Sequence, residues 1–92
     1  MTRCRVEVNY SGHVQGVGFR YTVKMLATGY EVVGTVRNLY DGRVELIAEG
    51  EKTELEQFLQ AIRDSEVGRF IRSEDIKWMP PTGTLKGFHI VG

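Results

Sequence analysis

The sequence predicts an α+β fold in which two helices cover one face of an antiparallel β-sheet. Three observations carry this prediction. Apolar and polar residues alternate along several short segments, which is typical of half-buried strands. Two other segments repeat their apolar residues at intervals of three and four, which is typical of amphipathic helices. The segments follow one another as β-α-β-β-α-β with a short extra strand at the end, which is the split-βαβ, ferredoxin-like pattern.

Size and composition narrow the class of protein. The chain has 92 residues, of which 41% are hydrophobic, so we expect one domain with one modest core. Its 12 basic residues balance its 12 acidic ones, which gives no basic patch for nucleic acid or an anionic membrane. No stretch approaches the length of a transmembrane helix. Because Cys4 has no disulfide partner and the N-terminus has no apolar signal region, we expect a cytoplasmic protein.

The first strand and the first helix are clear in the sequence. The segment from Arg3 to Tyr10 alternates with period two and places Cys4 on its apolar face, where it serves as a small core residue. A helix is expected from about Phe19 to Thr28, and Gly29 is a natural residue to end it. The apolar stripe of this helix consists of Phe19, Val23, Leu26, Ala27 and Tyr30.

A β-hairpin follows. The strands are expected at Val32 to Asn38 and at Arg43 to Glu49, and the Asp-Gly pair between them is a strong hairpin signal. Asp41 is therefore interpreted as a turn former and not as a catalytic carboxylate. Asn38 ends an inward-facing row of apolar and small residues, where an amide side chain is out of place unless it bonds something. Either it binds a ligand or it caps the turn through its own backbone.

The second half of the chain predicts another helix and two extended segments. Residues 53–56, Thr-Glu-Leu-Glu, match a capping box, so we expect a helix that begins there and ends near Ser65. Its apolar stripe consists of Leu55, Phe58, Leu59 and Ile62. Alternation predicts strands around residues 75–78 and 88–90, whereas residues 66–74 have no clear pattern.

The loop between the first strand and the first helix indicates a site for an anion. Residues 12–20 contain three glycines: Gly12, Gly16 and Gly18. A glycine-rich turn between a strand and a helix can aim backbone N–H groups at one point, where the helix N-terminus adds partial positive charge. Arg20 opposes the helix dipole and repels Lys24, four residues on, so a bound phosphate would relieve both. The alternative is a purely structural turn.

Two motifs resemble the signatures of the acylphosphatase family. The first reads Gly12-x-Val14-Gln15-Gly16-Val17-x-Phe19-Arg20, and the second reads Gly34-x-Val36-x-Asn38-x-x-Asp41-Gly42-x-Val44-Glu45. The resemblance extends from about Arg3 to Ile90. Thr35 departs from it, since the family commonly has an aromatic residue there. Because that position should face away from the helices, we expect an effect on the surface or on stability. The segment from Val67 to Thr84 matches only loosely.

The resemblance implies one acylphosphatase-like domain over residues 1–92. It implies hydrolysis of the carboxyl-phosphate bond of acyl phosphates, by direct attack of a positioned water and without metal or cofactor. Arg20 and Asn38 would be the catalytic residues: Arg20 would bind the phosphoryl group and Asn38 would orient the water. The substrate-binding loop would comprise Val14, Gln15, Gly16, Val17, Gly18, Phe19 and Arg20.

The residue types suit this chemistry. A guanidinium makes two-pronged contacts with phosphoryl oxygens that an ammonium cannot copy. Phosphoryl transfer depends mainly on positioning and charge stabilisation, and a carboxylate leaves without a general acid. His13 lies beside the first motif but has no evident partner, and His89 is interpreted as a surface residue of the last strand.

Other functions remain open at this point. A non-catalytic ferredoxin-like module could bind a phosphate-bearing ligand without turning it over. The chain could also act as an accessory domain, like the one at the start of hydrogenase-maturation carbamoyltransferases. RNA recognition is disfavoured because the central strands offer no stacked aromatic pair. We expect a monomer whose partners are a small-molecule acyl phosphate and inorganic phosphate, with no nucleic acid and no membrane.

Overall fold

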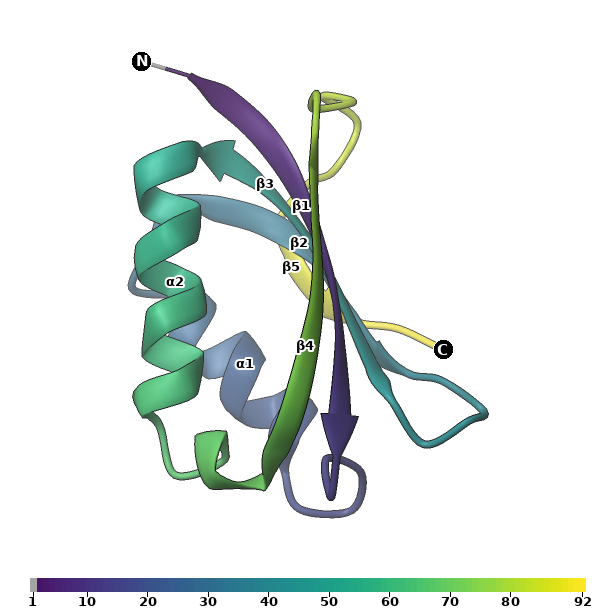
Figure 1. The fold of residues 1–92 in the computed structure, drawn as a ribbon. Coiled ribbons are helices and arrows are strands. Elements are labelled where there is room, and N and C mark those ends of the chain that lie inside the picture. The colour runs from purple at the N-terminus through teal and green to yellow at the C-terminus, as the bar shows by residue number, and fades with distance from the viewer. Residues whose placement is uncertain (1) are drawn as a thin grey trace.

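The computed structural model describes residues 2–92 and has two helices on one face of a five-stranded sheet (Figure 1). The strands are β1 (Arg3–Gly12), β2 (Val32–Asn38), β3 (Val44–Glu51), β4 (Ile71–Met79) and β5 (Phe88–Ile90). The helices are α1 (Phe19–Ala27) and α2 (Lys52–Asp64), and a short 3₁₀ turn, η1, covers Gly68–Phe70. This confirms the predicted β-α-β-β-α-β order with an extra strand. None of the described helices is long and apolar enough to cross a membrane.

The sheet order is β4-β1-β3-β2-β5, and every pair is antiparallel except the last. β5 lies parallel to β2, so the sheet is mixed, whereas the sequence pattern predicted an antiparallel one. The difference arises because alternation is the same in strands of either direction. Hydrogen bonds from the Gly34 N–H to the Gly87 carbonyl (2.8 Å) and from the Val91 N–H to the Val36 carbonyl (3.1 Å) attach this last strand. Phe88 also packs edge-on against Phe58 of α2.

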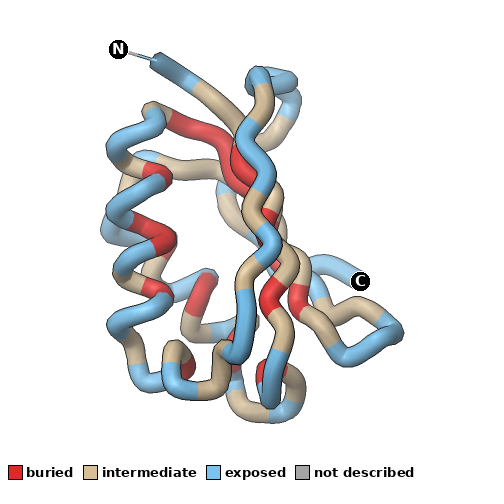
Figure 2. The backbone as a smooth tube through the Cα atoms, in the orientation of Figure 1, coloured by how far each residue is buried: buried red, intermediate tan, exposed pale blue. Residues whose placement is uncertain are grey.

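The core lies between the helices and the sheet, where the buried positions face each other (Figure 2). The sheet contributes alternate residues, as period two requires: Val6, Val8, Tyr10, Val36, Val44, Leu46 and Ala48. The helices contribute most of the predicted stripes as buried residues: Phe19, Val23 and Ala27 from α1, and Leu55, Phe58, Leu59 and Ile62 from α2. The other two predicted residues, Leu26 and Tyr30, pack against the core but are only partly buried, and Tyr30 lies beyond the end of α1. Cys4 is partly buried against this core, as expected. Thr35 is half-buried between the buried Gly34 and Val36, consistent with the expected outer face.

The start of α2 differs from the sequence prediction. β3 runs without a loop into the helix, whose N-cap is Glu51 and has no side-chain capping bond. The Lys52 N–H donates instead to the Thr2 carbonyl at 2.9 Å. Thr53 already lies inside the helix, so the predicted capping box is wrong. One amide of the first turn is thus satisfied by the residue that precedes β1, because the beginning of β1 pairs with the end of β3.

The ends of the helices are close to those predicted. α1 ends at Ala27 with Thr28 as its C-cap, and α2 ends at Asp64 with Ser65 as its C-cap. Gly29 follows the C-cap as expected, but it does not adopt the left-handed conformation common at that position. The unassigned residues 66–74 form η1 and the first part of β4. β4 is an edge strand with most of its side chains partly or fully exposed, which explains its weak apolar pattern.

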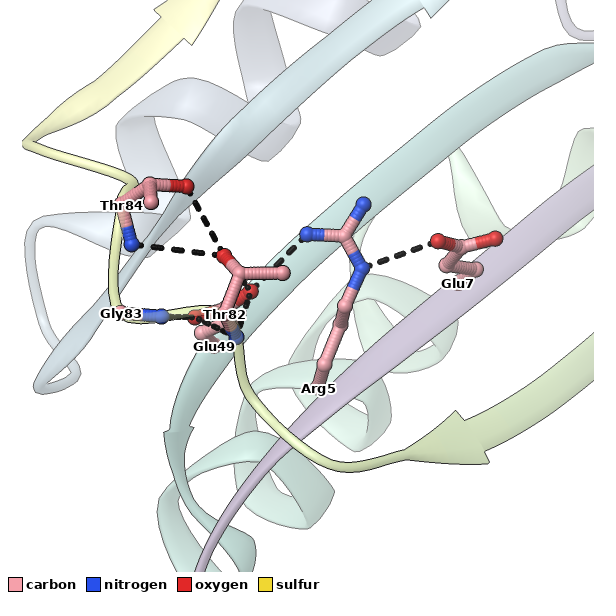
Figure 3. Close-up of polar contacts among 6 residues, drawn as sticks. All are labelled: Arg5, Glu7, Glu49, Thr82, Gly83 and Thr84. Atoms are coloured by element: carbon pink, nitrogen blue, oxygen red, sulfur yellow. Dashed lines mark hydrogen bonds and ion pairs between the residues drawn. The ribbon is translucent and has the colours of Figure 1, made fainter.

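Glu49 is the buried charged residue of the described chain, with 1% of its surface exposed. It alternates with Ala48 and therefore points to the face of the sheet away from the helices. Arg5 of β1 donates a hydrogen bond of 2.9 Å from its guanidinium to the Glu49 carboxylate. The carboxylate also accepts hydrogen bonds of 2.9 to 3.1 Å from the backbone amides of residues 82 and 83 and from the Thr82 hydroxyl (Figure 3). These contacts fasten the connection between β4 and β5 over that face.

The Glu49 contacts make stability depend on pH. Burial raises the pKa of Glu49, but the Arg5 and amide donors outweigh burial and lower it from 4.5 to about 2. The stabilisation is therefore present above pH 4.5 and is lost as the pH falls from 4.5 toward 2. One pKa unit corresponds to about 1.4 kcal/mol, so the ionised Glu49 contributes up to about 3 kcal/mol to the free energy of unfolding at neutral pH.

Glu49→Gln is expected to lower the free energy of unfolding at pH 7 and to flatten its decline between pH 5 and pH 2. Urea unfolding of both proteins across that range is the measurement. Glu7→Gln is the matched control, because Glu7 also pairs with Arg5 but is 37% exposed. Equal pH profiles for the wild type and Glu49→Gln would contradict a stabilising role of the charge.

Candidate active site

The loop between β1 and α1 has the backbone conformation that its glycines allow. Gly16 and Gly18 have φ of +79° and +81°, in the left-handed region that other residues rarely adopt. Gly18 is also the N-cap of α1. A Cβ atom at either position would meet nothing within 4 Å, so the requirement for glycine comes from the backbone and not from crowding. The two residues turn the chain sharply into the N-terminus of α1.

A cleft of about 180 Å³ opens beside this loop. It is lined by Val14, Gly16, Gly18, Phe19, Arg20, Tyr21, Asn38 and Ile90. The loop, the first turn of α1, the end of β2 and the last residue of β5 thus meet at one place. Arg20 and Asn38, far apart in the sequence, line the same cleft. The α1 N-terminus is also free here, because its first intrahelical bond runs from the Thr22 N–H to the Gly18 carbonyl at 3.0 Å.

Arg20 brings a cation to the cleft that no carboxylate of the described residues neutralises. The half-buried side chain has no ion pair or hydrogen bond within residues 2–92, whereas nearby arginines are paired. Arg37 binds Glu45 at 2.8 Å, and Arg43 binds Asp41 at 2.8 Å. α1 has no acidic residue in its first turn. The cleft is therefore suited to an anion, which would meet both the guanidinium and the free amides of the helix.

Asn38 presents an unsatisfied amide to the cleft. Its Oδ1 atom is buried and has no hydrogen-bond partner within the described residues. The following turn is closed without it, because Asp41 accepts from the Arg43 N–H at 3.1 Å. The alternative that Asn38 caps the turn is therefore wrong, and the interpretation of Asp41 as a turn former is confirmed. A buried polar atom without a partner costs about 1–3 kcal/mol, so the amide is suited to bind a water or ligand.

Two of the residues expected in the binding loop do not line the cleft. The Gln15 side chain donates to the carbonyls of Leu39 and Arg43 at 2.7 and 2.9 Å, so it ties the glycine loop to the hairpin. Val17 packs against the core. Gln15 thereby fixes the loop relative to the end of β2, where Asn38 lies. This is a positioning contact, and the sequence motif did not show that it would reach the hairpin.

Sequence reasoning missed two residues of the cleft, Tyr21 and Ile90. Tyr21 directly follows Arg20 and lies off the apolar stripe of α1, so its spacing could have identified it. Ile90 reaches the cleft only because β5 pairs with β2, which no local pattern indicates. The two histidines lie elsewhere: His13 packs against Phe70, and the His89 ring lies 2.9 Å from the Lys86 carbonyl. Within residues 2–92, no group of three His, Cys, Asp or Glu could hold a metal ion.

Fold and cleft together define a small ferredoxin-like protein with a cleft suited to an anion between a glycine loop and the sheet. The acylphosphatase family model matches residues 6–90. The chain is 37% identical over 91 residues to an acylphosphatase of Roseiflexus sp., covering 99% of this chain and 98% of that protein. It is 43% identical over 89 residues to an acylphosphatase of Clostridium acetobutylicum, and the match covers 95% of this chain and 96% of that protein. The chain therefore belongs to the acylphosphatase family.

Solved structures agree with this assignment. The crystal structure of acylphosphatase from Bacillus subtilis matches with a TM-score of 0.87 and 34% identity, over 97% of this chain and 99% of that one. A crystal structure of full-length HypF in the phosphate- and nucleotide-bound form matches with a TM-score of 0.85 and 28% identity, over 99% of this chain but only 12% of HypF. The family activity, hydrolysis of acyl phosphates, is accordingly the activity of this chain.

Gly16→Val and Gly18→Val test the loop. Each forces a β-branched residue to positive φ, which we expect to cost about 1–3 kcal/mol of stability or to raise KM for an acyl phosphate. Gly29→Ala is the control, because Gly29 follows the C-cap of the same helix and has no positive φ. Urea unfolding, Michaelis constants and competitive inhibition by inorganic phosphate are the measurements. Unchanged values in both valine variants, together with no phosphate inhibition, would show that the loop is only a turn.

Proposed function

We propose that hydrolysis takes place in the cleft between the glycine loop and the end of β2, with Arg20 binding the phosphoryl group and Asn38 orienting the attacking water. The observation that carries this proposal is that an unpaired guanidinium and an unpartnered amide line one small cleft. Both groups lack partners in the described chain, and an acyl phosphate with its attacking water would supply partners to both.

The phosphoryl group is held by positive charge and by N–H groups. The Arg20 guanidinium can donate two parallel hydrogen bonds to phosphoryl oxygens. The amides of residues 19–21 have no partner within the helix, and the loop glycines let the backbone approach closely. Because Arg20 lies in the first turn of α1, its guanidinium and these amides border the same cleft. They also bind inorganic phosphate, which is the product.

The chemical step is a displacement at phosphorus. The water oxygen forms a bond to phosphorus while the bond between phosphorus and the acyl oxygen breaks, and the electron pair leaves with the carboxylate. One water proton remains on the phosphate product, and the other is taken up by solvent or by a phosphoryl oxygen. The carboxylate is stable unprotonated, so the step needs no general acid. What the protein supplies is orientation of the water by Asn38 and stabilisation of charge by Arg20.

We further propose that the chain acts as one domain and as a cytoplasmic monomer on small molecules. All five strands join one sheet, and both helices pack on one face of it, which supports a single folding unit. The lone cysteine is partly buried and unpaired, which supports a reducing compartment. Sedimentation of the purified protein tests the monomer: a mass near 10.4 kDa is expected.

The test of the site begins with the purified protein and two substrates, acetyl phosphate and benzoyl phosphate. We expect both to be hydrolysed to carboxylate and inorganic phosphate, with unchanged rates in EDTA. Loss of activity in EDTA, restored by a divalent cation, would refute the mechanism without a metal. Binding of inorganic phosphate without hydrolysis of either substrate would instead indicate a non-catalytic phosphate-binding module.

A further inference from the structure

We propose that Tyr21 and Ile90 form the subsite for the acyl group, so that the enzyme prefers acyl phosphates whose acyl group is apolar, and aromatic above all. The inference rests on the proposed function, because it takes Arg20 to hold the phosphoryl end of the substrate. The inference adds the direction in which the acyl end of the substrate extends and the chemistry of the protein surface that the acyl group contacts.

The first argument is the exposure of these side chains. Val14 and Phe19 also line the cleft, but they belong to the core and expose 1% and 2% of their surface. Tyr21 exposes 64% and Ile90 38%, so their apolar surface is open to solvent beside the anion site. Covering that surface with an apolar acyl group removes it from water, which favours binding. An aromatic acyl group can in addition pack against the Tyr21 ring.

The apolar surface extends beyond the cleft. Met25 lies one helical turn after Tyr21, on the same side of α1, and is 52% exposed. α1 and β5 lie in contact, so Tyr21 and Met25 of α1 and Ile90 of β5 belong to adjoining elements. Three of the exposed large hydrophobic residues of the described chain thus lie on two neighbouring elements that border the anion site. A long acyl group would find apolar surface along its length.

The second argument is the direction of the displacement. The attacking and leaving oxygens lie roughly in line through phosphorus. A second cavity of about 340 Å³ meets the cleft at Asn38 and is lined mainly by polar groups, among them Gln15, Arg37 and Tyr40. Water at Asn38 is therefore supplied from that side. The acyl oxygen must then leave on the side opposite Asn38, toward the first turn of α1, where Tyr21 follows Arg20.

The third argument is charge. Among the residues that line the cleft, only Arg20 is charged at neutral pH, and it is engaged with the phosphoryl group. A carboxylate or ammonium on the acyl group would lose water there without gaining a further partner among the lining residues, which is unfavourable. The cleft therefore discriminates against charged acyl groups as well as favouring apolar ones.

The experiment compares benzoyl phosphate with acetyl phosphate, which share the phosphoryl end and differ in the acyl group. We expect Tyr21→Ala to lower kcat/KM for benzoyl phosphate about 10-fold and to change that for acetyl phosphate by less than about 2-fold. Tyr21→Phe keeps the ring and should retain the wild-type values. Ile90→Ala should reduce the preference for benzoyl phosphate by a few-fold. The inhibition constant of inorganic phosphate should stay unchanged in all three variants.

Trp78→Ala is the matched control, because Trp78 is an exposed aromatic residue on β4, at the opposite edge of the sheet from β5. It should leave both kcat/KM values unchanged. Equal losses for the two substrates in Tyr21→Ala, with weaker phosphate inhibition, would overturn the inference and assign Tyr21 to the phosphate loop. An unchanged kcat/KM for both substrates in Tyr21→Ala would also overturn the inference, because it would show that the acyl group extends into solvent. Failure of the proposed function would give a different result from failure of this inference. In that case the wild type would hydrolyse neither substrate, or Arg20→Ala would hydrolyse both.

Discussion

Arg20→Ala is expected to lower kcat/KM for acyl phosphates by about 1,000-fold or more, the scale of losing an arginine that stabilises a transferring phosphoryl group. The proposed role of Arg20 is to contact phosphate before and during the reaction, so the variant should lose kcat and also bind substrate and inorganic phosphate more weakly. Arg20→Lys should recover little, because an ammonium cannot make the two-pronged contact.

The same substitution should leave the folded state intact. Arg20 has no ion pair in the described chain, opposes the dipole of α1 and lies four residues from Lys24. Removing it should therefore keep the thermal midpoint at or above the wild-type value. Lys24→Ala is the control for loss of a cation from this helix without loss of a cleft residue, and its activity should stay near wild type. An active Arg20→Ala enzyme would contradict the proposed site.

Asn38→Ala is expected to lower kcat at least about 100-fold, the scale of one lost positioning contact, with KM nearly unchanged. The reason is that the proposed role of the amide is to orient the water, which matters only once attack begins. The affinity for inorganic phosphate should stay near wild type, in contrast to the Arg20 variants. Steady-state kinetics and phosphate inhibition are the measurements.

Asn9→Ala is a close control for this variant. Asn9 also has a buried Oδ1 atom without a hydrogen-bond partner, but it lies on β1 and does not line the cleft. Its replacement should leave kcat unchanged. An Asn38→Ala enzyme with full kcat but weak phosphate binding would reverse the two proposed roles. Equal losses in the Asn9 and Asn38 variants would show that the effect is structural.

Much of the candidate site could be predicted because its signals are local. The glycines at 16 and 18 mark a turn through positive φ, which depends on the residues themselves. Arg20 indicates an anion in the sequence because a cation in the first turn of a helix is unfavourable without one. Asn38 indicates a binding role because it is a polar residue at the end of an apolar row. The structure brings Arg20 and Asn38 to one cleft, and it removes the turn-capping alternative for Asn38.

The sequence by itself determined the strands, the helices and their order, because periods of two and of three to four follow from the geometry of each element. It also determined the glycine turn and the Asp-Gly hairpin. Tertiary structure alone decided the parallel pairing of β5 with β2, which brings Ile90 to the cleft, and the contact of Gln15 with the hairpin. It also decided that the Thr2 carbonyl, and not the Thr53 side chain, accepts from an amide at the start of α2. These contacts join residues far apart in the chain, so their formation depends on how the whole sheet assembles and leaves no periodic pattern in any one segment.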